Sequence, residues 1–327
     1  MNDFVARQRQ AQADYFRRAG IVAGHGGSAW RIASRTENLT PDIRPVAEAY
    51  FHQHGITWHR HANHGLSSQT CCLNFLMPLA ERPDVLSRLV GRALDIAPPK
   101  MRSVEPGPDG RDWFVGFEWT GKEDYLGEWP KGGRATRGAN ATSADAVIQF
   151  AGDDGPETLL IEWKYTEAYG APLQDRRRTD GTGGNDTRAR RYGDKAFSPD
   201  GPLRADMGLR LDDFFWEPFY QLLRQQMLAW RMERALGERV RVLHISPAGN
   251  TALHRVTSQA IAKASGEADA FDAFKALLQP QPDGVPRFVS STIEALFGPE
   301  VEALQGDPWA DHLRERYRLL NSTEQEN

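Results

Sequence analysis

The stretch from Asp145 to Lys164, DAVIQFAGDDGPETLLIEWK, decides the fold. Its two apolar runs flank the turn-rich segment GDDGPE, which predicts an antiparallel β-hairpin. Side chains alternate between the two faces of a strand, so Glu162 and Lys164 share one face. If the turn is centred on the two consecutive aspartates, Asp145 lies directly opposite Glu162, and opposed residues share a face. The hairpin therefore predicts two carboxylates and a lysine side by side.

Two carboxylates placed in this way repel each other unless a cation lies between them. Mg²⁺ prefers oxygen ligands and is commonly held by one or two carboxylates, waters and substrate phosphate. Such an ion polarises a phosphodiester and activates a bound water, and a nearby lysine can orient that water or stabilise the developing charge. The pattern indicates metal-dependent phosphodiester hydrolysis. The alternative is an ordinary hairpin whose solvated face carries Asp145, Glu162 and Lys164.

These residues resemble the PD-(D/E)XK superfamily, the restriction-endonuclease-like nucleases. Asp145 matches the first acid of the motif, and the triplet Glu162-Trp163-Lys164 matches the rest, although Ala144 stands where proline is usual. The strings RGANATSADAVIQF and LLIEWKYTEAYG are similar to a bacterial branch of nuclease-like proteins, and the similarity extends from about Ser67 to the C-terminus.

The resemblance implies an α/β fold whose core is a central mixed sheet flanked by helices, with helical N- and C-terminal extensions. It also implies that Asp145 and Glu162 bind Mg²⁺, which Mn²⁺ can replace, and that Lys164 acts on the attacking water. The expected partner is nucleic acid, with DNA favoured over RNA. A homodimer is compatible with this family but no interface is evident. The alternative function is a catalytically silent nucleic-acid-binding or assembly protein on the same fold.

The order of predicted elements comes from the residues themselves. Apolar spacing and turn residues predict helix, strand, strand, strand, helix and strand, over residues 67–95, 112–119, 144–150, 158–164, 213–236 and 240–246. Asp212 or Asp213 is expected to begin the long helix, and Gly237 to end it. The predicted organisation is an N-terminal extension at 1–65, a nuclease core at 66–250 and a helical C-terminal extension at 251–327 packed on the core.

Further site residues are predicted around the hairpin. Gln221 and Gln225 adjoin on one face of the long helix, with Arg224 beside them. Superfamily members often place a glutamine or tyrosine of this helix in the active site, which would make Tyr220 and Gln221 catalytic. The alternative is that they are polar groups on a helix surface. Glu118, on the predicted strand 112–119, is a candidate additional metal ligand, although its spacing is not diagnostic.

The net charge of −4 gives no general attraction to nucleic acid, so any affinity must come from a local basic patch. The segment 170–210 is rich in glycine and arginine and predicts a long basic loop. Its candidate phosphate contacts are Arg176, Arg177, Arg178, Arg188, Arg190 and Arg191. The alternative is a solvated insertion whose charges only maintain solubility.

Other classes of protein fit the sequence less well. The apolar runs are too short for a membrane span, and the two cysteines are adjacent, which favours unpaired thiols in a reducing cytoplasm. Neither a phosphate-binding GXXXXGK(S/T) loop nor an HEXXH motif occurs. A zinc site remains an alternative, because histidines crowd the stretch before the cysteines, at His52, His54, His59, His61 and His64.

Overall fold

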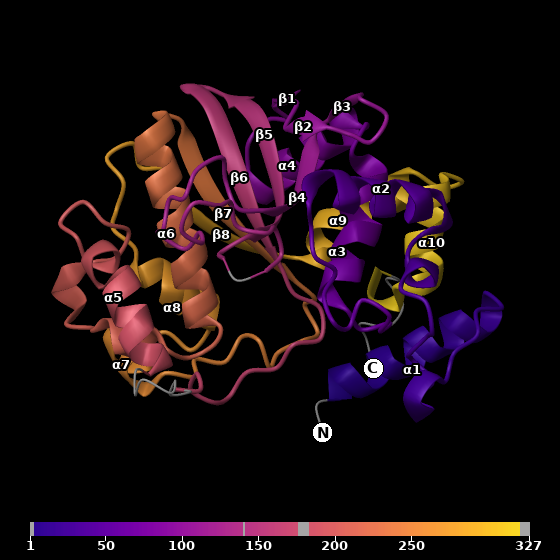
Figure 1. Cartoon of the computed structure of the whole chain (residues 1–327), viewed down its shortest axis with the longest axis horizontal. Helices are drawn as coiled ribbons and strands as arrows, with labels where there is room; N and C mark the ends of the chain where they lie inside the picture. Colours follow the sequence, from indigo (N-terminus) through magenta and orange to yellow (C-terminus); the bar gives the residue numbers. More distant parts are fainter. Residues whose placement is uncertain (1–2, 140, 176–182, 321–327) are drawn as a thin grey trace.

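The structure is a computed structural model, and it describes residues 3–139, 141–175 and 183–320. A mixed sheet of strand order β1-β5-β6-β7-β8, with β4 also paired to β5, lies at the centre of the molecule (Figure 1). Its strands are β1 (Lys100–Arg102), β4 (Val115–Trp119), β5 (Ala144–Gly152), β6 (Gly155–Trp163), β7 (Arg239–Ser246) and β8 (Phe288–Thr292). A separate short ribbon consists of β2 (Glu105–Pro106) and β3 (Asp112–Trp113).

Helices cover both faces of this sheet, which confirms the predicted fold class (Figure 1). One face carries α1 (Asp3–Arg18), α2 (Arg44–His54), α3 (Ser68–Leu76), α4 (Pro83–Leu94), α9 (Ile293–Ala303) and α10 (Pro308–Arg316). The other carries α5 (Gly184–Ala196), α6 (Phe219–Leu236), α7 (Gln259–Ser265) and α8 (Ala270–Leu277). None of the helices in the described ranges is long and apolar enough to cross a bilayer.

The β5–β6 hairpin has the predicted register. Ala146 pairs with Ile161 and Gly152 pairs with Gly155, so the turn is centred on the two consecutive aspartates. Gly155 has a φ of 134°, a conformation that glycine adopts without the steric cost paid by other residues. One step beyond the last pair toward the open end of the hairpin, Asp145 and Glu162 stand opposite each other.

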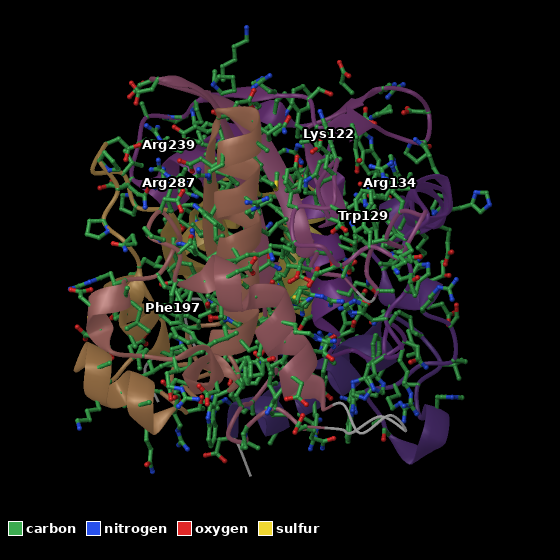
Figure 2. All side chains as sticks on the ribbon, turned by 60° about the vertical axis from the view of Figure 1, so that its left-hand side comes forward. Lys122, Trp129, Arg134, Phe197, Arg239 and Arg287 are labelled. Carbon is green, nitrogen blue, oxygen red and sulfur yellow. The ribbon has the colours of Figure 1, made fainter. Side chains whose placement is uncertain are left out.

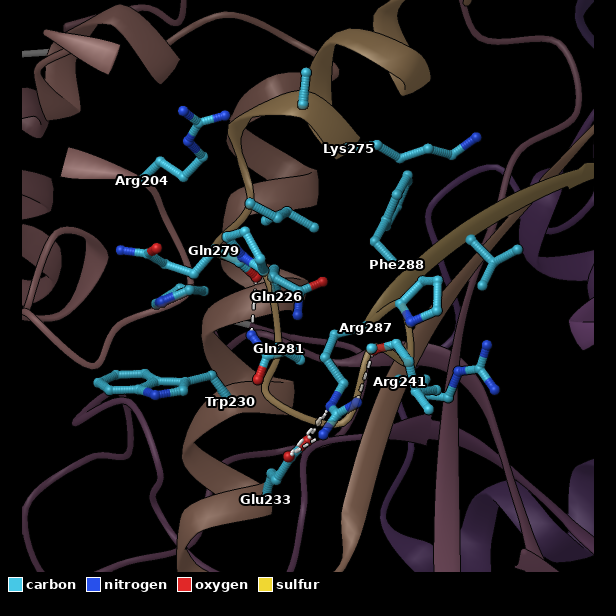
Figure 3. A pocket seen from close by; sticks show the side chains of 18 of the residues that line it. Arg204, Gln226, Trp230, Glu233, Arg241, Lys275, Gln279, Gln281, Arg287 and Phe288 are labelled. Atoms are coloured by element: carbon cyan, nitrogen blue, oxygen red, sulfur yellow. Dashed lines mark hydrogen bonds and ion pairs between the residues drawn. The ribbon is translucent and has the colours of Figure 1, made fainter. Parts of the chain in front are cut away.

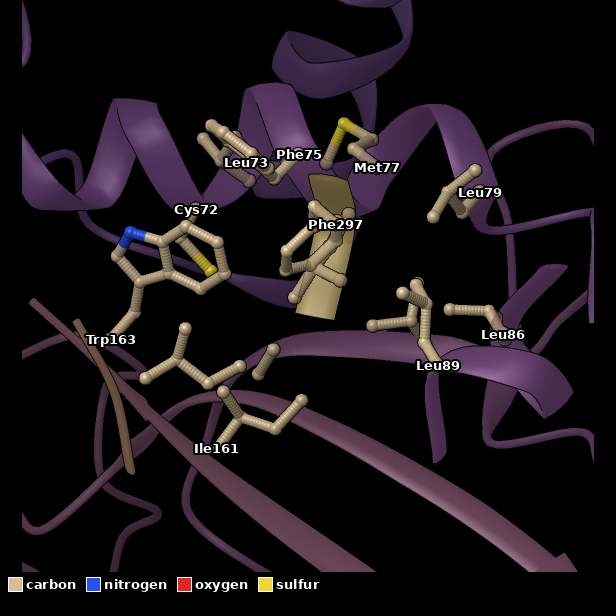
Figure 4. Close-up of a cluster of buried hydrophobic side chains, with 14 of the residues drawn as sticks. Cys72, Leu73, Phe75, Met77, Leu79, Leu86, Leu89, Ile161, Trp163 and Phe297 are labelled. Carbon is tan, nitrogen blue, oxygen red and sulfur yellow. The ribbon is translucent and has the colours of Figure 1, made fainter. Parts of the chain in front are cut away.

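Alternation along β6 divides its side chains between two cores. Leu159, Ile161 and Trp163 enter the first core, where Trp163 packs against Phe75 and Phe297 (Figure 4). Leu160 enters the second core on the opposite face, beneath α6. Because neighbouring residues alternate, Glu162 projects to the same face as Leu160, toward α6.

The long helix begins later than predicted. The residues around Asp213 form a 3₁₀ turn, Leu211–Phe214, and the Asp213 carboxylate accepts a hydrogen bond from the backbone N–H of Arg210. Helix α6 starts at Phe219, directly after Pro218. Proline disfavours helical geometry in the residue before it, which explains why the helix cannot start further upstream. The end at Gly237 is as predicted, with this glycine in the left-handed conformation.

Two predicted segments contain additional secondary structure. The segment 170–210, predicted as a loop, includes helix α5, whose Tyr192 and Ala196 are four residues apart and enter the second core. The many glycine and arginine residues around Tyr192 and Ala196 conceal their helical spacing in the sequence. The C-terminal extension, predicted to be helical, also supplies β8, which pairs in parallel with β7. Its sequence FVSST is short and rich in residues that favour strands.

Candidate active site

A cavity of about 190 Å³ opens beside the ends of β5 and β6, below α6. Its wall includes three carboxylates, those of Glu118, Asp145 and Glu162. Residues of the β4–β5 connection and of α6 complete it, namely Gly138, Ala139, Ala141, Thr142, Ser143, Gln221, Arg224 and Gln225, together with His59. The cavity therefore brings together four of the predicted site residues, namely Glu118, Asp145, Glu162 and Gln221.

The three acids lie in one row across neighbouring strands. Phe117 of β4 pairs with Ala146 of β5, and Ala146 pairs with Ile161 of β6. One residue further along this register, Glu118, Asp145 and Glu162 stand beside one another, because directly opposed residues of antiparallel strands share a face. The row is thus a consequence of strand register rather than of chain proximity.

Asp145 is held by the backbone of the neighbouring strand. Its Oδ2 accepts a hydrogen bond of 2.6 Å from the N–H of Trp163. Burial raises the pKa of Asp145 well above its usual 3.8, and the adjacent Glu162 and Glu118 raise it further. Lys164 opposes this shift. An ionised Asp145 is therefore stabilised by any cation that enters the cavity.

Glu162 and Lys164 form a buried ion pair. The Nζ of Lys164 lies 2.5 Å from Oε1 of Glu162, and the two residues are 7% and 2% exposed. Burial alone would lower the pKa of Lys164, but Glu162, Tyr169, Asp145 and Glu167 together outweigh burial and raise that pKa well above its usual value. Lys164 is therefore a cation at neutral pH, as a residue that stabilises developing negative charge must be.

Glu118 is fixed by its neighbours in an uncommon backbone conformation. Its φ is 49°, a left-handed value that is unusual for a residue other than glycine. Arg137 donates hydrogen bonds to the backbone carbonyls of Phe117 and Glu118 and so holds this bend. The Glu118 carboxylate accepts from Gln69 at 2.7 Å and from Ser143 at 3.3 Å. Strain maintained in this way is characteristic of functional sites.

The donor set fits one magnesium ion with few protein ligands. Within the described ranges no three His, Cys, Asp or Glu side chains are close enough to hold a metal together. Asp145 and Glu162 stand side by side at the cavity and supply hard oxygen ligands, and Mg²⁺ usually keeps several waters and binds substrate phosphate besides one or two carboxylates. Glu118 is already engaged by Gln69 and Ser143, so its role as an additional ligand stays a prediction.

The structure assigns unequal positions to the predicted residues of α6. Gln225, one turn after Gln221, donates a hydrogen bond of 2.7 Å to Oε2 of Glu162 and another of 2.7 Å to the carbonyl of Ser143. Gln221 lines the cavity, but its Oε1 accepts from the hydroxyl of Tyr169. Tyr220 does not line the cavity and packs against the second core instead. The sequence feature that could have identified Gln225 as a site residue is its spacing of four from Gln221, which places both on one face of the helix.

Replacing Gln225 by leucine is expected to lower cleavage by about 10- to 100-fold, because groups that orient metal ligands commonly contribute this much. The Gln225 side chain contacts Glu162. Glutamate at position 225 should therefore lower the rate more than leucine does, because it adds a fourth carboxylate to the three at the cavity. The effect is measured as the Mg²⁺ concentration for half-maximal rate in wild type, Gln225→Leu and Gln225→Glu. An unchanged magnesium requirement in both variants would contradict this role.

The predicted basic residues are only partly described. Arg176, Arg177 and Arg178 lie outside the described residues. Arg190 of α5 is exposed and Arg191 is half-buried. Arg188 is half-buried and stacks over the ring of Tyr220, with 5.3 Å from its guanidinium carbon to the ring centroid. Arg190 is therefore the most accessible of these three candidate phosphate contacts.

The β4–β5 connection carries further cations that the sequence did not single out. Lys122, Lys131 and Arg134 are exposed on this segment. Further along, the segment lines the carboxylate cavity with Gly138, Ala139, Ala141, Thr142 and Ser143. Figure 2 shows Lys122 and Arg134 together with Trp129 on this side of the molecule. Arg134 lies over the Trp129 ring, with 5.6 Å to its centroid. A basic segment in this position can contact the phosphates of a nucleic acid.

The side chains of the histidine-rich stretch contact different partners and do not gather at one point. His54 lies 3.6 Å from the Glu105 carboxylate, and His59 lies 3.3 Å from that of Glu118. The indole N–H of Trp30 donates to His64 at 3.2 Å. Cys71 and Cys72 are free and buried. In the parts of the chain that the structure describes, the alternative of a His/Cys zinc site therefore has no ligand cluster to support it.

Comparison with known proteins gives one family match. The model described as "REase-ARP: Restriction Endonuclease associating with ARP" matches residues 8–318. No curated protein and no solved structure matches the chain.

Proposed function

Because the chain belongs to the family of restriction endonucleases associating with ARP over residues 8–318, we propose that it is a metal-dependent nuclease. Its reaction would be hydrolysis of phosphodiester bonds, with DNA as the favoured substrate and Mg²⁺ as the cofactor. Mn²⁺ is expected to substitute. The family description names an association with ARP, and we extend that expectation to this chain.

One observation carries the proposal: Asp145 and Glu162 line one cavity at the end of the hairpin, and Lys164 forms an ion pair with Glu162 there. Taking charged groups out of water is costly, and a fold gains little stability from doing so. Clusters of this kind with shifted pKa values are characteristic of catalytic sites. A structural hairpin would have no need of two acids facing each other beside a cavity.

The roles of the residues follow from their contacts. Asp145 and Glu162 would hold the magnesium ion, which when bound polarises the phosphodiester and lowers the pKa of a coordinated water. The N–H of Trp163 fixes the orientation of Asp145, and Gln225 fixes that of Glu162. Lys164 supplies a permanent positive charge for the phosphate oxygens as negative charge develops on them. Arg224, in the cavity wall, can bind a flanking phosphate.

The test is cleavage by the purified full chain of supercoiled plasmid, single-stranded DNA and RNA, each with Mg²⁺, Mn²⁺ or EDTA. We expect cleavage of DNA in both metals and none in EDTA. Cleavage of RNA alone would support the proposed nuclease activity but would identify RNA, rather than DNA, as the substrate. If all three polymers are bound but none is cut under any condition, the catalytically silent binding protein becomes the better description.

A further inference from the structure

A second and larger cavity, of about 850 Å³, lies on the other side of α6 (Figure 3). Helix α6 contributes Gln226 and Trp230, the segment before β8 contributes Gln279, and β8 contributes Phe288. The cavity shares no lining residue with the carboxylate site. Its volume is typical of sites that bind small molecules.

Gln226 brings an unsatisfied polar atom to this cavity. The residue is 3% exposed, and its amide oxygen has no hydrogen-bond partner among the residues that the structure describes. A buried acceptor left without a donor is costly, and native proteins rarely retain one without a reason. Figure 3 shows Gln226 extending from α6 into the middle of the site. A ligand that donates a hydrogen bond there would satisfy it.

The remaining walls indicate a flat and negatively charged ligand. Trp230 lies four residues after Gln226 on the same helix, where both side chains adjoin. Leu278, Val285 and Phe288 add apolar surface. Five cationic side chains line the cavity against three acidic ones. The ligand must therefore combine a planar group, a hydrogen-bonding edge and an anion.

Two of the cations are available to such an anion. Arg204 pairs with Asp206, whose side chain is 68% exposed, and Lys275 pairs with Asp272, whose side chain is 56% exposed. Exposed pairs of this kind contribute little and are readily exchanged. A phosphate would gain charge-assisted hydrogen bonds from Arg204 and Lys275 without breaking a buried contact.

We propose that this cavity binds a nucleotide. The amide of Gln226 would read the hydrogen-bonding edge of the base, as glutamine does with adenine. Trp230 would stack on the base, and Arg204 and Lys275 would bind the phosphate. The nucleotide can be free in solution or the terminal unit of a nucleic acid strand. Neither source requires metal or cleavage, so this site stands apart from the proposed nuclease activity.

The test is calorimetric titration of the full chain in EDTA, which removes the metal-dependent step. The ligands are the four deoxynucleoside monophosphates and short single-stranded oligonucleotides. Wild type is compared with Gln226→Leu and Trp230→Ala, and with Gln10→Leu, the same substitution at an exposed residue of α1. We expect about tenfold or greater loss of affinity in the first two variants and no change in the third.

Binding of monophosphates lost in both variants would identify a free nucleotide as the ligand, and binding of oligonucleotides alone would identify a strand end. Absence of binding to wild type, or equal binding by wild type and both variants, would overturn the proposal. Gln226→Leu removes an unpaired amide, so its melting temperature should equal or exceed that of wild type. If it fails to fold, the half-buried Trp230 decides the outcome through Trp230→Ala.

Discussion

The substitution Asp145→Asn is expected to abolish metal-dependent cleavage and to leave the fold intact. Asparagine keeps an acceptor for the N–H of Trp163 but removes a negative charge beside Glu162 and Glu118. Loss of that charge would remove a proposed magnesium ligand, and we expect the rate to fall by about 10³-fold, the upper range for loss of one preorganised electrostatic group. Stability should be equal or higher, because mutual repulsion of the acids is relieved.

The measurement is the rate of plasmid cleavage with Mg²⁺, together with a denaturant unfolding curve. Asp153→Asn is the matched control, because Asp153 is an exposed aspartate in the turn of the same hairpin. It should cleave at the wild-type rate. Wild-type cleavage by Asp145→Asn would remove Asp145 from the metal site. Unfolding of Asp145→Asn in the absence of denaturant would instead make Asp145 a structural residue.

The substitution Lys164→Met is expected to have the largest effect on stability. Methionine preserves the apolar part of the side chain but leaves the buried Glu162 carboxylate without its cation. Removing one partner of a buried pair typically destabilises a protein by about 3–5 kcal/mol. Cleavage should be lost as well, because Glu162 would lose the cation that lies 2.5 Å from its carboxylate.

A double variant separates these two effects. Lys164→Met combined with Glu162→Gln removes both charges, so most of the lost stability should return while cleavage remains absent. Lys195→Met is the matched control, because Lys195 pairs with Asp194, whose side chain is 75% exposed. A surface pair contributes about 1 kcal/mol or less. Equal unfolding free energies for Lys164→Met and Lys195→Met would contradict the buried-pair interpretation.

Much of the fold and the centre of the site could be predicted because the decisive information is local. The hairpin register depends on a two-residue turn and on alternation within about twenty residues, and Asp145, Glu162 and Lys164 follow from it directly. The family match over residues 8–318 confirms the superfamily to which these residues were assigned.

The rest of the site depends on contacts between distant segments. Which glutamine reaches Glu162 is decided by where α6 begins and how it is rotated on the sheet, and Pro218 moved that start from the predicted position. The conformation of Glu118 is maintained by Arg137 through two backbone carbonyls. Neither relation leaves a pattern in the intervening sequence, so periodicity alone could not have revealed it.

Helix α6 places two consecutive glutamines in two different cavities, and this arrangement limits how the chain can vary in length. Consecutive residues are about 100° apart around a helix, so Gln225 and Gln226 point in different directions. The rotation of α6 about its own axis therefore determines the positions of both side chains. Insertion of one residue near Phe219 would turn both amides away from their cavities together. The β4–β5 connection is expected to tolerate gains and losses far better at its exposed residues 130–134, because these residues are not part of a helix. Across the family, length changes should therefore gather in that connection and be absent from α6.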